Sequence, residues 1–267
     1  WQVRTPMHVG RNMSWSKQST RHKQIYYEVF HCNKNAYVDV LHSPLVDAYE
    51  CLGLSDEFSL ELGRTHSLGN LNVNQSPACV IKMRDNGHIR EKHSDLTGGD
   101  CQRMLNEKCD HELAVPVDGI TTTFAALRPM AEAGCNGDVM PSIRNSAKKC
   151  LIVFHQLFTL FSASAKLRNT IHTWGDHSEE HQRLVEEFFT ILHRDVNSKL
   201  VKNMKAGLTY LTWPAHYLGE HLSADMAAWA DFTGGLPFGR SSNQVTEHMN
   251  KIIKRFLRRH TNGRVSG

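Results

Sequence analysis

The sequence lacks the features of membrane-spanning proteins and of secreted disulfide-bonded proteins. No apolar run approaches the roughly 20 residues that a bilayer span requires, and the longest, Cys150–Phe161, is too short. The first residues contain no apolar signal-peptide segment. The seven cysteines are odd in number and include no Cys-x-x-Cys pair, which argues against a disulfide scaffold. This cysteine usage fits a reducing compartment best.

Two further absences narrow the classes of protein. There is no glycine-rich phosphate loop with its lysine, and there is no internal repeat at the periods typical of solenoids. With 40% hydrophobic and 22% charged residues, the composition is that of a globular protein rather than a disordered one. The 267 residues suffice for one large domain or two small ones with a sizeable core.

Histidine is unusually common, and the basic residues are unevenly placed. The chain has 17 histidines against 27 acidic residues, a surplus that metal binding, pH sensing or ordinary packing could explain. The net charge of +4 is mild, but no acidic residue follows Glu247. That last segment carries Lys251, Lys254, Arg255, Arg258, Arg259 and Arg264. A terminal basic segment favours contact with a polyanion, although a solvated helix face would show the same composition.

The spacing of apolar residues predicts a mainly α-helical chain with one or two short strands. Residues 36–41 are predicted to form a strand, because Tyr37, Val38 and Val40 are good strand formers. Residues 1–35 resemble a polar lead-in, and residues 70–77 a connector. Helical spacing recurs at 45–62, 99–109, 121–133, 142–172, 178–205, 214–229 and 241–260.

The last predicted helix has two different faces. Met249, Ile252, Ile253 and Phe256 share one face, while Glu247 lies in line with Lys251, Lys254 and Arg258 on another. A Glu to Lys pair four residues apart is a common helix-stabilising pair. The same carboxylate could instead hold a divalent cation beside a scissile phosphate, with the cations gripping the nucleic-acid backbone.

The residues around Glu247 resemble a known family. They are similar to the segment that bears the final glutamate of the catalytic DDE triad in the V(D)J recombination-activating (RAG) recombinase and the related Transib-type transposases, where an Asn-Lys pair follows three residues later. Three upstream segments resemble further motifs of that family, in the same order along the chain. The four segments are Val38–His42 (VDVLH), Leu96–Leu105 (LTGGDCQRML), His216–His221 (HYLGEH) and Asn243–Phe256 (NQVTEHMNKIIKRF).

The resemblance implies the C-terminal part of an RNase H-like (α/β) recombinase core. Residues 36–213 would form an RNase H-like strand and a helical insertion, and residues 214–267 a zinc-binding helix region and the C-terminal catalytic, basic helix. It implies Mg²⁺- or Mn²⁺-dependent nicking of DNA and hairpin formation by transesterification, with Glu247 as the third metal-binding carboxylate and Asp39 and His42 as supporting residues. Double-stranded DNA would be the substrate, a homodimer with an accessory subunit the assembly, and the nucleus the location. The residues expected to bind the DNA backbone are Lys251, Lys254, Arg255, Arg258 and Arg259.

The resemblance also leaves parts of the site to be found elsewhere. The first two catalytic aspartates and the Cys-x-x-Cys that would complete the zinc site are expected before Trp1, so the chain alone is not expected to cut DNA. Outside the resemblance, Asp39 and His42 would lie at the end of the predicted strand, a frequent place for active-site acids, although an aspartate that caps a turn would fit equally well.

His216 and His221 are the implied zinc ligands. They are five residues apart, about 140° around an ideal helix, so a regular helix would not direct both at one ion. Pro214 and Gly219 suggest that a helix begins or is distorted there. Two histidines supply half of a tetrahedral zinc site; without the resemblance, two partly buried packing histidines would be the simpler interpretation.

Three alternatives remain open at this stage. His177, Glu180 and His181 match the His-x-x-Glu-His pattern of zinc peptidases, although a capped helix start at Asp176 explains the same acids. Cys101 is either a reactive thiol or a small buried residue. The chain could also be a domesticated domain that binds DNA through its basic helix without catalysis.

Overall fold

The computed structural model describes residues 29–65, 80–85, 88–93, 96–105, 114–200, 212–242 and 244–261. Within these ranges, the side chains at 29–32, 63–65, 80–93, 197–200, 243–247 and 258–261 are outside the description. The chain is mainly helical, as the apolar spacing predicts, with two separate antiparallel hairpins.

The helices of the first half are α2 (Val29–Tyr37), η3 (Val38–His42), α3 (Ser43–Leu52), α4 (Ser55–Thr65), α5 (Gly98–Met104), η5 (Ala125–Leu127) and α6 (Arg128–Cys135). Those of the second half are α7 (Pro141–Asn169), α8 (Ser178–Ile191), η6 (Leu192–Leu200), α10 (Trp213–Glu220), α11 (Leu222–Thr233), η7 (Phe238–Ser241) and α12 (Gln244–Thr261). The hairpins pair β1 (Val80–Asp85) with β2 (His88–His93), and β3 (Val115–Val117) with β4 (Ile120–Thr122).

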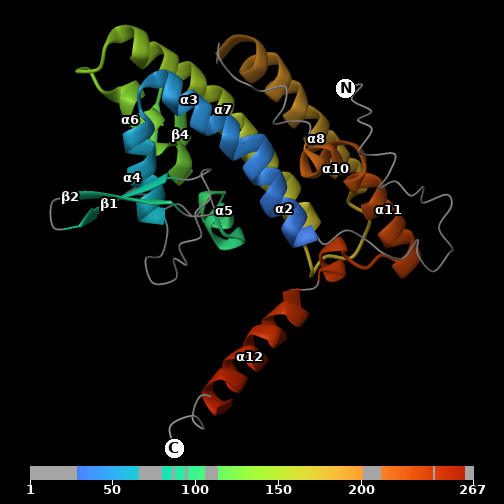
Figure 1. Cartoon of the computed structure of the whole chain (residues 1–267). Coiled ribbons are helices and arrows are strands. Elements are labelled where there is room, and N and C mark those ends of the chain that lie inside the picture. Colours follow the sequence, from blue (N-terminus) through green and yellow to red (C-terminus); the bar gives the residue numbers. More distant parts are fainter. Residues whose placement is uncertain are drawn as a thin grey trace, which may run out of the picture.

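Helix α7 is the centre of the fold. It is 29 residues long and packs against α2, α3, α6 and α8, and Figure 1 shows α2 and α3 running along it. By length and composition it is the one described helix that could cross a membrane, but 56% of its most apolar window is buried inside the protein. Its apolar character is accounted for by the core, which includes Phe154, Phe158 and Phe161.

The predicted strand at residues 36–41 is wrong. Ala36 and Tyr37 end α2, and Val38–His42 form a π-helical turn that continues directly into α3. Tyr37, Val40 and Leu41 are fully buried, and Tyr37 meets Phe158 and Phe161 of α7 edge-on at 6.2 and 5.9 Å between ring centroids. Burial against α7 therefore outweighs the strand preference of these β-branched and aromatic residues.

Three other boundaries differ from the predicted ones. The helix predicted at 45–62 is broken at Gly53, whose φ of +69° ends α3 in the left-handed conformation that glycine tolerates. The helix predicted at 121–133 begins later, at Arg128, because residues 121 and 122 belong to a hairpin whose turn lies at Asp118 and Gly119. The helix predicted at 214–229 is two helices that meet at His221.

Gly239 permits a close approach between η7 and the end of α7. A Cβ at this position would lie 2.7 Å from the carbonyl oxygen of Asn169 and 2.8 Å from the Ile171 side chain. Because the nearest atom is backbone, the contact cannot be relieved by a rotamer change. We expect Gly239→Ala to lower the free energy of unfolding by about 1–3 kcal/mol, measured by chemical denaturation.

The matched control is Gly137→Ala, since a Cβ there meets nothing within 4 Å and Gly137 does not have a positive φ. It should change stability by less than about 0.5 kcal/mol. Equal stability of the two variants would show that η7 does not press against α7 as described.

Candidate metal and nucleic-acid site

His216 and His221 face each other across the junction of α10 and α11. Their Nε2 atoms are 2.9 Å apart, and their ring centroids 4.8 Å. The pair meets because His221 lies between the helices, with φ −124° and ψ −33°, and a break in the helix there replaces the 140° separation of a regular helix. Two residues that a continuous helix would point apart are thereby directed at one position.

The break does not arise at the glycine that the sequence suggested. Gly219 lies inside α10, and a Cβ there would be 3.2 Å from Cε2 of Phe189 on α8. Gly219 therefore allows α10 to approach α8, whereas the change of direction occurs two residues later. Pro214, in the first turn of α10, starts the helix as predicted.

The histidine pair can share one proton or one cation. Two imidazoles bound to a single zinc ion at about 2.0–2.1 Å in tetrahedral geometry would have nitrogens roughly 3.3 Å apart, so the observed separation needs little adjustment. Trp213 lies nearly parallel to the His216 ring, at 24° and 6.3 Å. Among the described residues, no group of three histidine, cysteine or acidic side chains gathers at one place. The pair fits half of a zinc site.

A second polar contact lies beside the pair. Tyr217 Oη donates a hydrogen bond to Asp225 Oδ2, which joins the last turn of α10 to the first turn of α11. Burial raises the pKa of the Asp225 carboxyl, and the bond from Tyr217 opposes that rise. The bond helps to hold the angle between the two helices that carry His216 and His221.

The side chains of Asp39 and His42 lie in different surroundings. Asp39 Oδ2 accepts a hydrogen bond of 2.6 Å from Thr212 Oγ1, at the start of α10. Burial raises the pKa of the Asp39 carboxyl, with the Thr212 bond opposing it. His42 is buried among core aromatics, 5.9 Å from the Phe58 ring. Both residues lie in a π-helical turn rather than after a strand, which corrects the placement that the sequence suggested.

Helix α12 carries the basic segment. It extends away from the rest of the chain (Figure 1), and Lys251, Lys254 and Arg255 are exposed. Glu247 lies within α12, but its side chain is outside the described part, as are those of Arg258 and Arg259. The apolar face of α12 is also exposed. Between 44 and 59% of the surface of each residue is accessible at Met249, Ile252, Ile253, Phe256 and Leu257. The helix thus presents one basic and one apolar face.

The described contacts of His181 do not suit the zinc-peptidase interpretation. Arg168 Nη1 lies 2.9 Å from Nε2 of the fully buried His181, and Ser223 Oγ lies 2.7 Å from Nδ1. A guanidinium only donates, so Nε2 accepts and Nδ1 carries the proton. Burial and the charge of Arg168 hold the pKa of His181 well below its ordinary value. His181 has no lone pair left for a metal, and Glu180 is exposed and paired with Arg183.

The predicted capping box at Asp176 is wrong: the N-cap of α8 is His177, which makes no side-chain cap bond, and Asp176 lies one residue earlier, where Oδ1 accepts a bond from Ser178 N at 2.8 Å. Asp100 completes a capping box with Thr97 at the start of α5, and the next residue, Cys101, is 3% exposed. The buried interpretation of Cys101 is therefore favoured.

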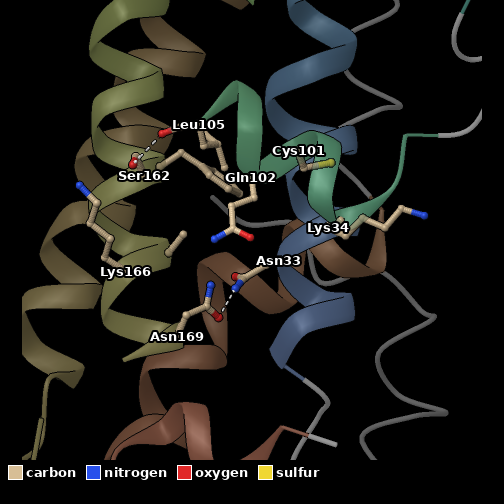
Figure 2. A pocket seen from close by; sticks show the side chains of 11 residues that line it. Asn33, Lys34, Cys101, Gln102, Leu105, Ser162, Lys166 and Asn169 are labelled. Atoms are coloured by element: carbon tan, nitrogen blue, oxygen red, sulfur yellow. Dashed lines mark hydrogen bonds between the residues drawn. The ribbon is translucent and has the colours of Figure 1, made fainter. Parts of the chain in front are cut away.

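A small cavity that the sequence did not suggest lies between α2, α5 and α7 (Figure 2). Its volume is about 190 Å³. The Gln102 amide points toward Asn33 and Asn169, whose side chains share a 2.7 Å hydrogen bond. Lys34 and Lys166 extend away from it. Scattered amides give no spacing signal, so only the packing of the three helices could reveal this site.

Comparison with protein-family models, with curated proteins and with solved structures found no match for the chain.

Proposed function

We propose that the chain is the C-terminal part of a RAG-like DNA recombinase or transposase core, in which α12 binds double-stranded DNA in the nucleus and supplies one metal-binding carboxylate, Glu247. The observation that carries the proposal is the convergence of His216 and His221 at 2.9 Å. The resemblance assigns zinc to these two residues, yet their spacing argues against convergence on a regular helix. A helix break that joins them supports the assignment independently of the motif.

In this proposal the histidine pair has a structural role. His216 and His221 would each give a neutral imidazole nitrogen to the zinc, and two thiolates from outside the described residues would complete four ligands. The pair would thereby fix the angle between α10 and α11, and so the direction from which the chain enters α12. The aromatic ring of Trp213 lies nearly parallel to His216 on one side of the pair.

The catalytic role falls to α12. Mg²⁺ or Mn²⁺ ions, when bound, would activate the attacking hydroxyl and stabilise the leaving oxygen. Glu247 would provide carboxylate oxygen, the ligand such hard cations prefer. Lys251, Lys254 and Arg255 would neutralise phosphates on the same DNA and so fix the strand relative to Glu247. A homodimer would place one such helix on each of two DNA ends.

Removing three cations from α12 tests the DNA contact. We expect Lys251→Gln, Lys254→Gln and Arg255→Gln together to weaken binding of duplex DNA uniformly across sequences. The slope of log K against log salt should become shallower by about 3, because each phosphate contact contributes about 0.9. Fluorescence anisotropy of a labelled duplex between about 50 and 200 mM salt measures both quantities.

The control removes the same charge elsewhere, through Lys149→Gln, Lys166→Gln and Arg183→Gln, all at exposed positions of α7 and α8. This variant should keep the wild-type salt slope within about 1. If both variants changed the slope equally, net charge rather than α12 would govern binding, and the proposed interface would be abandoned.

The second candidate is a non-catalytic DNA-binding domain. It rests on the same exposed basic face of α12, with Lys251, Lys254 and Arg255, and requires no metal-binding carboxylate. The two candidates make the same prediction for DNA binding and opposite predictions for substitution of Glu247.

A further inference from the structure

A single hydrogen bond joins two segments of the site that are 173 residues apart. Thr212 Oγ1 donates to Asp39 Oδ2 at 2.6 Å. Thr212 is the residue that precedes the first turn of α10, and its carbonyl accepts the backbone N–H of His216 at 3.0 Å. A side chain on the π-turn is thereby connected to the helical turn that carries one member of the histidine pair.

The Thr212 hydroxyl is used in an unusual way. A threonine at this position ordinarily accepts a bond from the backbone of its own helix, yet Thr212 makes no side-chain cap bond to α10. Pro214 in the first turn also removes one of the N–H groups that such a cap would satisfy. The hydroxyl instead donates outward, so the start of α10 is held by Asp39 rather than by its own cap.

The π-turn holds Asp39 in place. Val40, Leu41 and His42 are buried on the core side of η3, whereas Asp39 is half-buried and faces the start of α10. The wider turn is closed by the backbone N–H of Ser43, and the Ser43 hydroxyl also donates to Val38 O at 2.9 Å. Single π-turns within α-helices are frequent at functional sites. Here the turn presents one carboxylate from an otherwise apolar stretch.

Simple structural need does not explain a carboxylate at this position. The bond from Thr212 requires only an acceptor oxygen, which an asparagine would supply without a buried charge. A carboxylate differs by its negative charge, which is favourable beside the N-terminus of α10, where the backbone dipole is positive. The charge and the hydrogen bond therefore act together on the orientation of α10.

We propose that Asp39 is a positioning residue that, through Thr212, orients α10 so that His216 meets His221 and the pair binds zinc. This inference rests on the zinc role in the proposed function and adds the residue that aligns the pair. Substitution of a group that supports a metal-binding histidine typically lowers metal affinity by about 10–100-fold.

The test measures zinc affinity of a protein that joins this chain to the upstream Cys-x-x-Cys the resemblance implies, by competition with a chromophoric chelator, and cobalt absorption as a report on the ligand geometry. We expect Thr212→Val and Asp39→Ala each to weaken zinc binding by about 10–100-fold. Thr212→Ser, which keeps the hydroxyl, should stay within about 5-fold of wild type. Asp39→Asn, which keeps an acceptor but loses the charge, should fall between wild type and Asp39→Ala. The double variant Asp39→Ala with Thr212→Val should lose no more than either single variant, because both remove one contact.

The matched control is Asp47→Ala, since Asp47 is a half-buried carboxylate on α3 whose pKa burial also raises. It should bind zinc as wild type does. Thermal unfolding without metal separates misfolding from lost alignment. Thr212→Val replaces the hydroxyl by a methyl of similar size and Thr212→Ser removes only the methyl, so both are expected to fold, and loss of zinc with folding retained supports the proposal.

Two results would overturn the positioning role of Asp39, and they have different consequences for the zinc pair. Zinc binding that is abolished by His216→Ala but equal in Thr212→Val and Thr212→Ser would reject the role of Asp39 and leave the zinc pair intact. Zinc binding by wild type that His216→Ala does not affect would reject the zinc pair itself, and the positioning role with it.

Discussion

Replacing Glu247 by Gln is expected to abolish metal-dependent nicking of duplex DNA by a protein that joins this chain to the upstream aspartates the resemblance implies. The amide keeps the size of the side chain but removes the charge that a hard cation requires. Loss of groups that only support a metal ligand already costs about 10–100-fold, so loss of a ligand should lower the nicking rate by at least about 100-fold. The rate is measured on a labelled duplex in Mg²⁺ and in Mn²⁺.

DNA binding should survive the substitution, because the cations of α12 remain. Glu179→Gln, at an exposed position on α8, is the matched control and should nick at the wild-type rate. Unchanged nicking by Glu247→Gln would remove Glu247 from the catalytic site. A wild-type protein that binds DNA through α12 but does not nick it in either metal would instead favour the non-catalytic candidate.

The sequence predicts the helices well where one face of a helix meets the core. The apolar spacing over 142–172 corresponds to α7 within about three residues, and the start of α8 at 178 agrees with the structure. The prediction fails at 36–41 because Tyr37, Val40 and Leu41 are buried in a helix despite their strand preference. Periodicity over so short a run does not distinguish a buried strand from a buried helical turn.

The sequence predicts which residues form the candidate site but not how they are arranged in space. His216 and His221 were identified through the resemblance, and their convergence depends on a break at His221 that neither glycine nor proline marks. The Asp39–Thr212 bond spans 173 residues and depends on tertiary packing alone. Arg168 lies in the last turn of α7, where cations are common, and only the packing of α7 against α8 shows it to be buried.

Replacing Arg168 by Met should produce a large loss of stability. Arg168 is 0% exposed; it donates to Asn33 Oδ1, to Ser164 Oγ at 2.9 Å and to His181 Nε2 at 2.9 Å. Methionine fills much of the same space but donates nothing, so these buried acceptors lose their partner. We expect the free energy of unfolding to fall by about 3–5 kcal/mol, measured by urea denaturation at neutral pH.

Two further measurements make this prediction specific. Arg183→Met removes an arginine of α8 that is 60% exposed, and should cost less than about 1 kcal/mol. The pH dependence should also change, since burial first and the Arg168 charge second hold the pKa of His181 below its ordinary value. Below about pH 6.5 the unfolded chain takes up a proton at His181 that the folded chain does not, so the stability of the wild type decreases as the pH is lowered. Arg168→Met removes the second cause, so its free energy of unfolding should decline less steeply as the pH falls. A steeper decline would contradict the buried Arg168–His181 contact, and so would a loss of stability no larger than that of Arg183→Met.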